Sequence, residues 1–322
     1  MNHIVYIADE NYVIPTQVSL NSLCKNASKE ITAHILGVEL SDKSREKLKS
    51  IKSEFVTVQV LEIENTFEKY DFSHAYVSKV ALLKFRLPEI FKEFDKILYI
   101  DGDIILNKGF EKIFEFDISN YYAAVVQDML AVVRDKWTEK LGREKYFNSG
   151  VMYLNLARMR QDECTKKLID CKLNEKLHKF MDQDTLNCIL GENVLWIDCR
   201  FNFLVEYYPD VFSMEQIALF YSLNNDIQEQ CKKQPYFLHF AGNKKAWKDV
   251  ITPHFEEWIA FADDSLFLTL IKNYCAESEK RIDMLISTTK ELNSRLDYLQ
   301  HRTLFGATKW LLQKIFYARG IK

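Results

Sequence analysis

Two aspartates that follow a compact apolar segment are the residues of this sequence best suited to chemistry. Asp101 and Asp103 flank Gly102, directly after Lys96–Ile100, which has the composition of a buried strand. Side chains two positions apart in extended backbone point the same way, so both carboxylates should share one face. They repel each other unless a cation lies between them, and Mg²⁺ or Mn²⁺ prefers such oxygen ligands and bridges to phosphates. The pair predicts a metal–diphosphate site, although an exposed Asp-Gly hairpin turn would show the same letters.

A histidine and a third aspartate also lie at the ends of expected elements. His239 falls near the end of the strand-like segment Tyr236–Phe240, and imidazole is a competent Mn²⁺ ligand. A single histidine at a strand end is more often a polar residue satisfied by its neighbours. Asp182 begins the helical segment Asp182–Leu190, where an aspartate commonly caps the backbone. The residue type alone assigns no role at either position.

Five segments, taken in order, resemble the motifs of glycosyltransferase family 8. That family includes glycogenin and the bacterial lipopolysaccharide galactosyl- and glucosyltransferases. The matches run over residues 4–247, about three quarters of the chain, and five in order are far more specific than any one alone. The segments are Ile4–Tyr12, similar to the first strand and nucleotide loop, Lys96–Asp103, similar to the D-x-D strand, Asn148–Val151, similar to N-[AS]-G, Asp182–Asn187, similar to D-Q-D-x-L-N, and His239–Trp247, similar to H-[FY]-x-G-x-x-K-P-W.

The resemblance implies a retaining, metal-dependent hexosyltransferase that uses UDP-galactose or UDP-glucose. Its glycan acceptor would be carried by a lipid, lipopolysaccharide, capsule precursor or glycoprotein. Two alternatives stay open: a metal-dependent nucleotidyltransferase, and a catalytically silent, oligomeric scaffold that binds UDP-sugar. The first normally has a glycine-rich phosphate loop near its N-terminus, whereas the first glycine here is Gly37. The second leaves five matched motifs unexplained.

The same resemblance implies roles for individual residues at the metal and the donor. Asp101, Asp103 and His239 are expected to hold Mn²⁺ or Mg²⁺. The residues expected to bind the donor are Ala8, Asp9, Asn11, Lys84, Asp101, Gly102, Asn148, Gly242 and Lys245.

Three further residues are expected at the reacting sugar by the same resemblance. They are Gln183, Asp182 and Asp128, with Gln183 on the β-face of the anomeric carbon. An amide is a poor nucleophile, so we expect a front-face route through an oxocarbenium-like state. The sequence departs from the family at two positions. Lys84 stands where an arginine is usual and cannot reproduce its bidentate fork, and Ala246 replaces a proline.

Strand-like and helical segments alternate along most of the chain. This alternation predicts a mostly parallel mixed sheet with helices on both faces, a Rossmann-like α/β fold, which the resemblance identifies as GT-A type. Ligands bind such sheets beyond the carboxyl ends of the strands, where Asp9 and Asp101 fall. The expected strands are His3–Ala8, Ala33–Val38, Phe55–Ile63, Lys96–Ile100, Ala123–Gln127, Val151–Leu154 and Tyr236–Phe240. The expected helices are Val13–Cys24, Ser41–Lys52, Val77–Phe94 (bent or divided at Pro88), Asp182–Leu190 and Phe255–Tyr274 (one helix or two).

The pattern changes near the C-terminus. We expect one glycosyltransferase domain over residues 1–262 and a helical extension over residues 263–322. A heptad-like spacing in the extension fits either a coiled coil that joins copies of the chain or a long helix packed on the domain. The residues in that register are Ile282, Leu285, Thr289, Leu292, Leu296 and Leu299.

The last residues are basic and amphipathic. Residues 280–322 hold nine Lys and Arg against three Asp and Glu, although the whole chain carries a net charge of −3. A nucleic acid would satisfy this charge equally well. Trp310 at the apolar edge of Ala307–Lys322 instead favours an anionic membrane surface, so we expect no nucleic-acid partner.

Cysteine usage and the N-terminus indicate the compartment. The seven cysteines are odd in number and form no C-x-x-C motif, which favours free thiols in a reducing environment. No signal peptide and no apolar stretch of about 20 residues are visible. We therefore expect a cytoplasmic protein that is peripheral at the inner face of the cell membrane.

Overall fold

The computed structural model describes residues 1–68, 79–134, 136, 138–139, 142, 144–174, 182–207, 211–242, 245–248, 250, 252–280 and 286–293. The chain separates into two compact units, Met1–Asp264 and Ser265–Lys322. All seven cysteines lie in the described residues and are free thiols.

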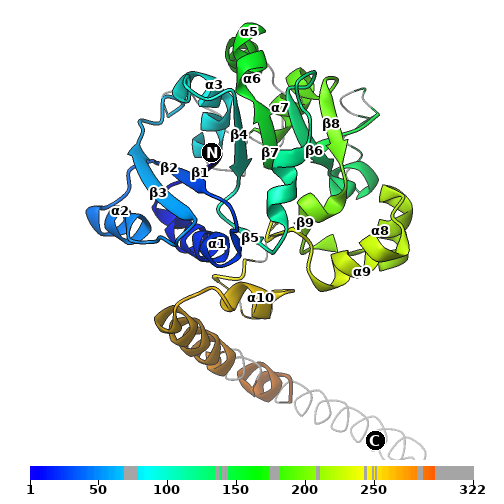
Figure 1. The fold of residues 1–322 in the computed structure, drawn as a ribbon. Coiled ribbons are helices and arrows are strands. Elements are labelled where there is room, and N and C mark those ends of the chain that lie inside the picture. Colours follow the sequence, from blue (N-terminus) through cyan, green and yellow to red (C-terminus); the bar gives the residue numbers. More distant parts are fainter. Residues whose placement is uncertain are drawn as a thin grey trace, which may run out of the picture. The chain divides into compact units, whose positions relative to one another are not determined.

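The first unit is built on a twisted seven-stranded sheet among the described residues (Figure 1). Its strands, in order across the sheet, are β3 (Val56–Glu62), β2 (Ile31–Gly37), β1 (Asn2–Ala8), β4 (Lys96–Ile100), β7 (Phe147–Asn155), β6 (Ala123–Gln127) and β8 (Val194–Ile197). Neighbouring strands are parallel, except that β7 is antiparallel to both β4 and β6. The predicted α/β fold with a mostly parallel mixed sheet is confirmed.

A second, smaller sheet lies next to the D-x-D segment. It comprises β5 (Ile104–Leu106), β10 (Phe237–His239) and β9 (Phe203–Leu204). The central strand β10 is antiparallel to β5 and parallel to β9. Only β10 had been expected from the sequence, because β5 and β9 have three and two residues and show no readable alternation.

Helices cover the main sheet and contribute one apolar core. Helix α1 (Val13–Asn26) packs on β1 and β5, and α2 (Asp42–Lys49) packs on β3. The segments η2 (Lys79–Arg86), α6 (Cys164–Asn174) and α7 (Gln183–Leu190) pack together, and their buried side chains join those of β1, β4 and β7 in the core. The remaining helical segments are η1 (Glu10–Tyr12), α3 (Leu87–Ile90), η3 (Phe110–Glu115), η4 (Leu130–Arg134), α5 (Leu156–Gln161), η5 (Cys199–Phe201), α8 (Met214–Tyr221), α9 (Asn225–Lys233) and α10 (Phe255–Ile259).

Two expected elements differ from the structure. The helix expected over Val77–Phe94 is instead a 3₁₀ segment, η2, followed by the short α3, and residues 77 and 78 lie outside the described residues. Pro88 lies in the first turn of α3, where a missing N–H costs no hydrogen bond, so it starts a new helix. Strand β7 begins four residues earlier than expected, at Phe147. The polar Asn148-Ser149-Gly150 motif is therefore part of a buried strand.

The second unit is helical over residues 265–280 and 286–293. Of the expected heptad positions, Thr289 and Leu292 lie in the described residues, and the other four lie outside them. The basic segment Ala307–Lys322 also lies outside, so its membrane role stays a prediction. No helix in the described part of the chain is long and apolar enough to cross a bilayer.

Candidate active site

The Asp101–Asp103 turn is the point where the chain crosses from the main sheet to the small one. Asp101 follows β4, and Asp103 precedes β5, which belongs to the other sheet. The hairpin alternative is therefore wrong, since β4 and β5 do not pair. The Asp103 residue is also only 3% exposed, unlike a residue of a surface turn.

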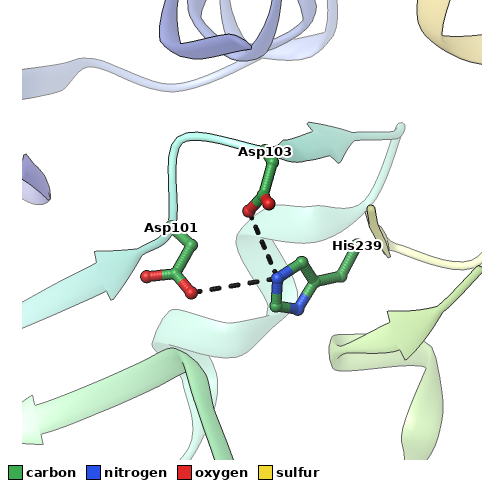
Figure 2. Close-up of side chains that lie close together, drawn as sticks. All are labelled: Asp101, Asp103 and His239. Carbon is green, nitrogen blue, oxygen red and sulfur yellow. Dashed lines mark ion pairs between the residues drawn. The ribbon is translucent and has the colours of Figure 1, made fainter. Parts of the chain in front are cut away.

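Strand pairing brings His239 to the same place. In the small sheet His239 pairs with Ile104, the residue that follows Asp103. Its Nε2 lies 3.8 Å from Oδ2 of Asp101 and 3.3 Å from Oδ1 of Asp103 (Figure 2). One ligand atom from each of the three residues lies within 4.8 Å of the others. These are the three residues expected from the sequence to hold a metal ion, and the two sheets bring them together.

Each carboxylate has one oxygen engaged and one turned toward His239. Oδ1 of Asp101 accepts hydrogen bonds from the Tyr99 hydroxyl at 2.6 Å and lies 3.1 Å from Nζ of Lys84. Oδ2 of Asp103 accepts from Nζ of Lys245 at 2.8 Å. The other oxygen of Asp103, Oδ1, is buried and receives no hydrogen bond from any described residue. Buried polar atoms are normally satisfied, so this orphaned oxygen fits a cation ligand.

The charge of Asp103 is maintained in spite of its burial. Burial alone would raise the pKa of this carboxyl, but the neighbouring Lys245 ammonium and His239 together outweigh burial and hold the pKa well below its ordinary range. Two carboxylate oxygens and one imidazole nitrogen form a donor set that suits Mn²⁺.

Two glycines are required by the packing around this site. A Cβ on Gly150 of β7 would lie 2.3 Å from Cε1 of His239, so only glycine leaves room for the imidazole. A Cβ on Gly102 would lie 2.4 Å from Oγ1 of Thr16 on α1. The missing side chain of Gly102 thus lets the turn pack on α1.

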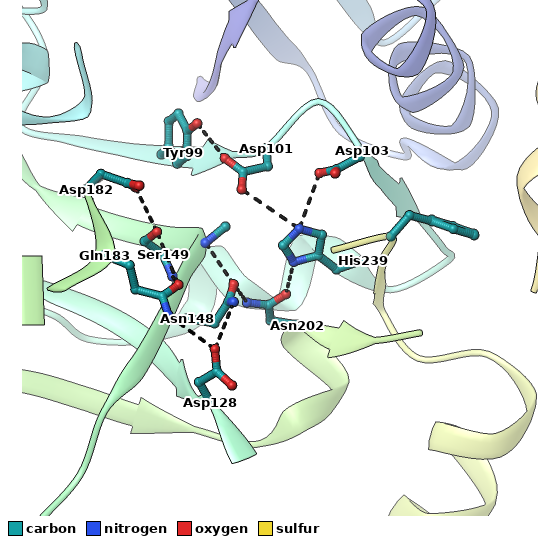
Figure 3. Close-up of polar contacts among 12 residues, drawn as sticks. Tyr99, Asp101, Asp103, Asp128, Asn148, Ser149, Asp182, Gln183, Asn202 and His239 are labelled. Atoms are coloured by element: carbon teal, nitrogen blue, oxygen red, sulfur yellow. Dashed lines mark hydrogen bonds and ion pairs between the residues drawn. The ribbon is translucent and has the colours of Figure 1, made fainter. Parts of the chain in front are cut away.

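A buried amide and carboxylate network adjoins the cluster of Asp101, Asp103 and His239 (Figure 3). Oδ2 of Asp128 accepts from Nδ2 of Asn148 at 3.2 Å and from Nε2 of Gln183 at 3.3 Å. Oε1 of Gln183 accepts from the backbone N–H of Ser149 at 3.0 Å. Asp128 follows β6, Asn148 lies on β7 and Gln183 begins α7, and the structure brings these expected site residues together.

Asp182 and Lys84 form a buried ion pair next to this network. Nζ of Lys84 lies 2.7 Å from Oδ2 of Asp182, and the Ser149 hydroxyl donates to the same oxygen at 2.9 Å. The Asp182 side chain makes no capping hydrogen bond to α7, so the capping alternative is wrong for it. Burial would lower the pKa of Lys84, but Asp101 and Asp182 together raise it above its ordinary range.

The other expected donor residues lie around the edge of this cluster. Ala8 ends β1, and the Asp9 carboxylate accepts the backbone N–H groups of Asn11 and Tyr12, so it caps η1. Gly242 has a φ of +84°, and a Cβ there would collide with the Glu206 carboxylate. Ala8 and Asp9 thus lie at the carboxyl end of β1, whereas Gly242 follows β10 of the small sheet.

The chain matches the Glycosyl transferase family 8 model over residues 3–250. It belongs to that family. It is 26% identical over 252 residues to a lipopolysaccharide 1,2-glucosyltransferase of Escherichia coli, covering 75% of this chain and 71% of the relative. It is 24% identical over 311 residues to the glycosyltransferase GlyF of Streptococcus pneumoniae serotype 4, covering 93% of this chain and 72% of GlyF.

A solved relative confirms the GT-A type of fold. The galactosyltransferase LgtC, crystallised with donor and acceptor sugar analogues, matches with a TM-score of 0.68 and 20% identity over 80% of this chain and 94% of LgtC. Family 8 membership makes the chain a glycosyltransferase, with a nucleotide-sugar donor and a glycan acceptor.

Several residues of the family 8 site were not predicted from the sequence. Tyr99 and Ser149 hold site carboxylates, and Gly150 makes room for His239; all three lie within matched motifs but had been given no role. Asn202, whose Oδ1 lies 2.9 Å from Nδ1 of His239, lies in no matched motif and gave no sequence signal.

Proposed function

We propose that this chain is a retaining, metal-dependent hexosyltransferase that transfers galactose or glucose from a UDP-sugar. The observation that carries the proposal is the convergence of Asp101, Asp103 and His239, with an unsatisfied carboxylate oxygen at its centre. Family 8 membership supports glycosyl transfer over the nucleotidyltransferase alternative.

The cluster suits the departure of a nucleoside diphosphate. A divalent ion held by the three side chains would offset negative charge on the UDP leaving group. Lys245, now 2.8 Å from Asp103, is close enough to add a second positive charge. We propose that Ala8, Asp9 and Asn11 bind the nucleotide, and that Gly102 and Gly242 allow close backbone approach.

Gln183 is the residue we propose at the β-face of the sugar. Both ends of its amide are held, the oxygen by Ser149 and the nitrogen by Asp128. A fixed amide dipole suits stabilisation of an oxocarbenium-like state better than nucleophilic attack. We expect Gln183→Ala to lower kcat about 100-fold or more while Mn²⁺ affinity stays unchanged. A covalent glycosyl adduct on Gln183, detected by mass spectrometry, would contradict the front-face route.

The relatives support the choice of hexose and acceptor. Two of them are a lipopolysaccharide 1,2-glucosyltransferase and the galactosyltransferase LgtC. We propose a glycan of the cell envelope, held by a lipid or a protein, as the acceptor. Association of the basic C-terminal segment with the inner membrane surface would place the enzyme beside such an acceptor.

The test is UDP release from a panel of UDP-sugars in the presence of Mn²⁺. The wild type should hydrolyse one UDP-hexose, EDTA should abolish the reaction, and Asp103→Asn should lower the rate about 100-fold or more. Asp117→Asn is the matched control, because Asp117 is an exposed carboxylate that accepts hydrogen bonds from Ser119. Failure of the wild type to bind UDP with Mn²⁺ present would refute the proposal, and tight UDP-sugar binding without turnover on any acceptor would favour the scaffold alternative.

A further inference from the structure

Asn202 is a fully buried amide between the metal cluster and the sugar-side network. It follows η5, immediately before β9, and is 0% exposed. Its Oδ1 lies 2.9 Å from Nδ1 of His239, and its Nδ2 donates to Oδ1 of Asn148 at 2.9 Å (Figure 3). It is therefore the link between His239 and the residues around Asp128.

The direction of the hydrogen bonds is set at the far end of this link. The backbone N–H of Gly150 can only donate, and it donates to Oδ1 of Asn148 at 2.9 Å. Nδ2 of Asn148 then donates to Asp128, whose carboxylate can only accept. Both ends of the Asn148 amide are thus determined by groups with a single hydrogen-bonding role.

That direction passes through Asn202 to the imidazole. Because Oδ1 of Asn148 is an acceptor, Asn202 must direct its Nδ2 there and its Oδ1 toward His239. The opposite orientation would place two acceptor oxygens 2.9 Å apart. Facing an acceptor, Nδ1 of His239 must carry its proton, which leaves the lone pair of a neutral ring on Nε2, the nitrogen that faces Asp101 and Asp103.

We propose that Asn202 is a positioning residue that holds His239 with its Nε2 lone pair directed toward the proposed metal position, while Gly150 leaves the room that the ring needs in this orientation. Metal-bound histidines usually donate their second N–H to a fixed acceptor, which sets both tautomer and orientation. Gly150 contributes through the space left by its missing Cβ, 2.3 Å from Cε1 of His239. The inference rests on the metal site of the proposed function and adds a residue that no matched motif contains.

The test is Mn²⁺ binding without any donor sugar. Calorimetry measures the affinity, and pulsed electron paramagnetic resonance measures the coupling of the bound Mn²⁺ to the ¹⁴N nucleus of the imidazole. Asn202→Ala should weaken Mn²⁺ binding about 10–100-fold and reduce the imidazole nitrogen coupling. Asn202→Asp keeps an acceptor for Nδ1–H but sets a second acceptor oxygen against Oδ1 of Asn148, so it should retain the imidazole nitrogen coupling that Asn202→Ala loses, although it gives up the hydrogen bond to Asn148. Gly150→Ala should reduce the nitrogen coupling as Asn202→Ala does.

The matched control is Asn155→Ala. Asn155 is also a buried asparagine with two backbone partners, but it lies at the other end of β7. Equal Mn²⁺ affinity and nitrogen coupling in Asn202→Ala and the wild type would overturn the inference, as would equal losses in Asn155→Ala. If the wild type itself binds Mn²⁺ no better than His239→Ala, the proposed metal site fails, and the inference falls with it.

Discussion

Lys84 is a buried cation with two carboxylate partners, Asp101 and Asp182. Lys84→Met would leave both carboxylates without their counter-charge, and we expect the free energy of unfolding to fall by about 3–5 kcal/mol in urea denaturation. Lys84→Arg keeps the charge but forces a larger group into a site that holds one ammonium, so we expect a loss of about 1–3 kcal/mol. Lys112→Met, at an exposed lysine, is the control. Equal unfolding free energies for Lys84→Met and the wild type would contradict the ion pair's role.

At the scale of residues, the sequence could predict the site residues that lie inside a recognisable motif. Asp101, Asp103 and His239 could be proposed because each lies in a contiguous motif. Asn202 could not, because its role depends on a hydrogen bond across 37 residues of sequence. Asp182 illustrates a second limit, since an aspartate directly before a helix fits an N-cap in the sequence. Only the structure shows that its carboxylate accepts a hydrogen bond from Lys84 instead of capping α7.

At the scale of elements, the D-x-D turn depends on its contact with α1. Gly102→Ala would place a methyl group 2.4 Å from Oγ1 of Thr16, and we expect it to lower the free energy of unfolding by about 1–3 kcal/mol and to impair UDP-sugar hydrolysis. Thr16→Ala removes the obstructing oxygen, which has no hydrogen-bond partner among the described residues. The double variant should therefore regain part of the lost activity. If Thr16→Ala gives no rescue, the turn requires Gly102 for another reason.

A histidine pair joins the parallel strands β1 and β2. Nδ1 of His3 lies 3.1 Å from Nε2 of His34, and burial, assisted by His3, lowers the pKa of His34 to about 4. Glu93 acts in the opposite direction but does not outweigh them. Between pH 6.5 and about 4 the unfolded chain therefore binds a proton at His34 that the folded chain does not.

The free energy of unfolding should accordingly fall as the pH is lowered through that window. His34→Phe removes the titrating group and keeps a ring against Phe91, so its stability should depend less steeply on pH between 6.5 and 4. Urea denaturation of both proteins at several pH values measures the difference. Parallel pH profiles would show that His34 is not responsible.

The expected elements were most accurate where a compact apolar run stood between polar residues. Strand β6 matches its expected bounds, Ala123–Gln127, because an apolar run with polar flanks is readable locally. The expected range of β7 was too short because Asn148 and Ser149 are polar and do not look like strand residues. Both are nevertheless buried, by strand pairing and by contacts within the site. Helical spacing over residues 79–86 could not distinguish 3₁₀ from α geometry, because both place apolar residues three apart.

At the scale of the whole molecule, the site exists because one chain builds two sheets. The chain leaves the main sheet at Asp101 and enters the small sheet after Asp103, and β10 returns His239 to that crossing point. The proposed metal ligands are therefore fixed by pairing within both sheets of the first unit. We infer that catalytic function resides in residues 1–264, whereas the basic segment of the second unit serves localisation.

That division of roles predicts the behaviour of a truncated chain. Residues 306–322 carry four basic and no acidic side chains, and each basic group near an anionic bilayer contributes about 1 kcal/mol to binding. Deleting Gly306–Lys322 should release the protein from vesicles that contain phosphatidylserine, while hydrolysis of the UDP-sugar in solution continues unchanged. Co-sedimentation with such vesicles, and with neutral phosphatidylcholine vesicles, measures the first effect.

A charge reversal separates electrostatic attraction from loss of the segment itself. Lys309→Glu with Lys314→Glu should weaken vesicle binding and its dependence on salt, since attraction is screened over about 8 Å at physiological ionic strength. Lys232→Glu with Lys233→Glu makes the same change on α9 and should leave vesicle binding intact. Equal vesicle binding by the truncated and full-length proteins would show that this segment does not bind the membrane. The enzyme would then have to reach its acceptor without the segment.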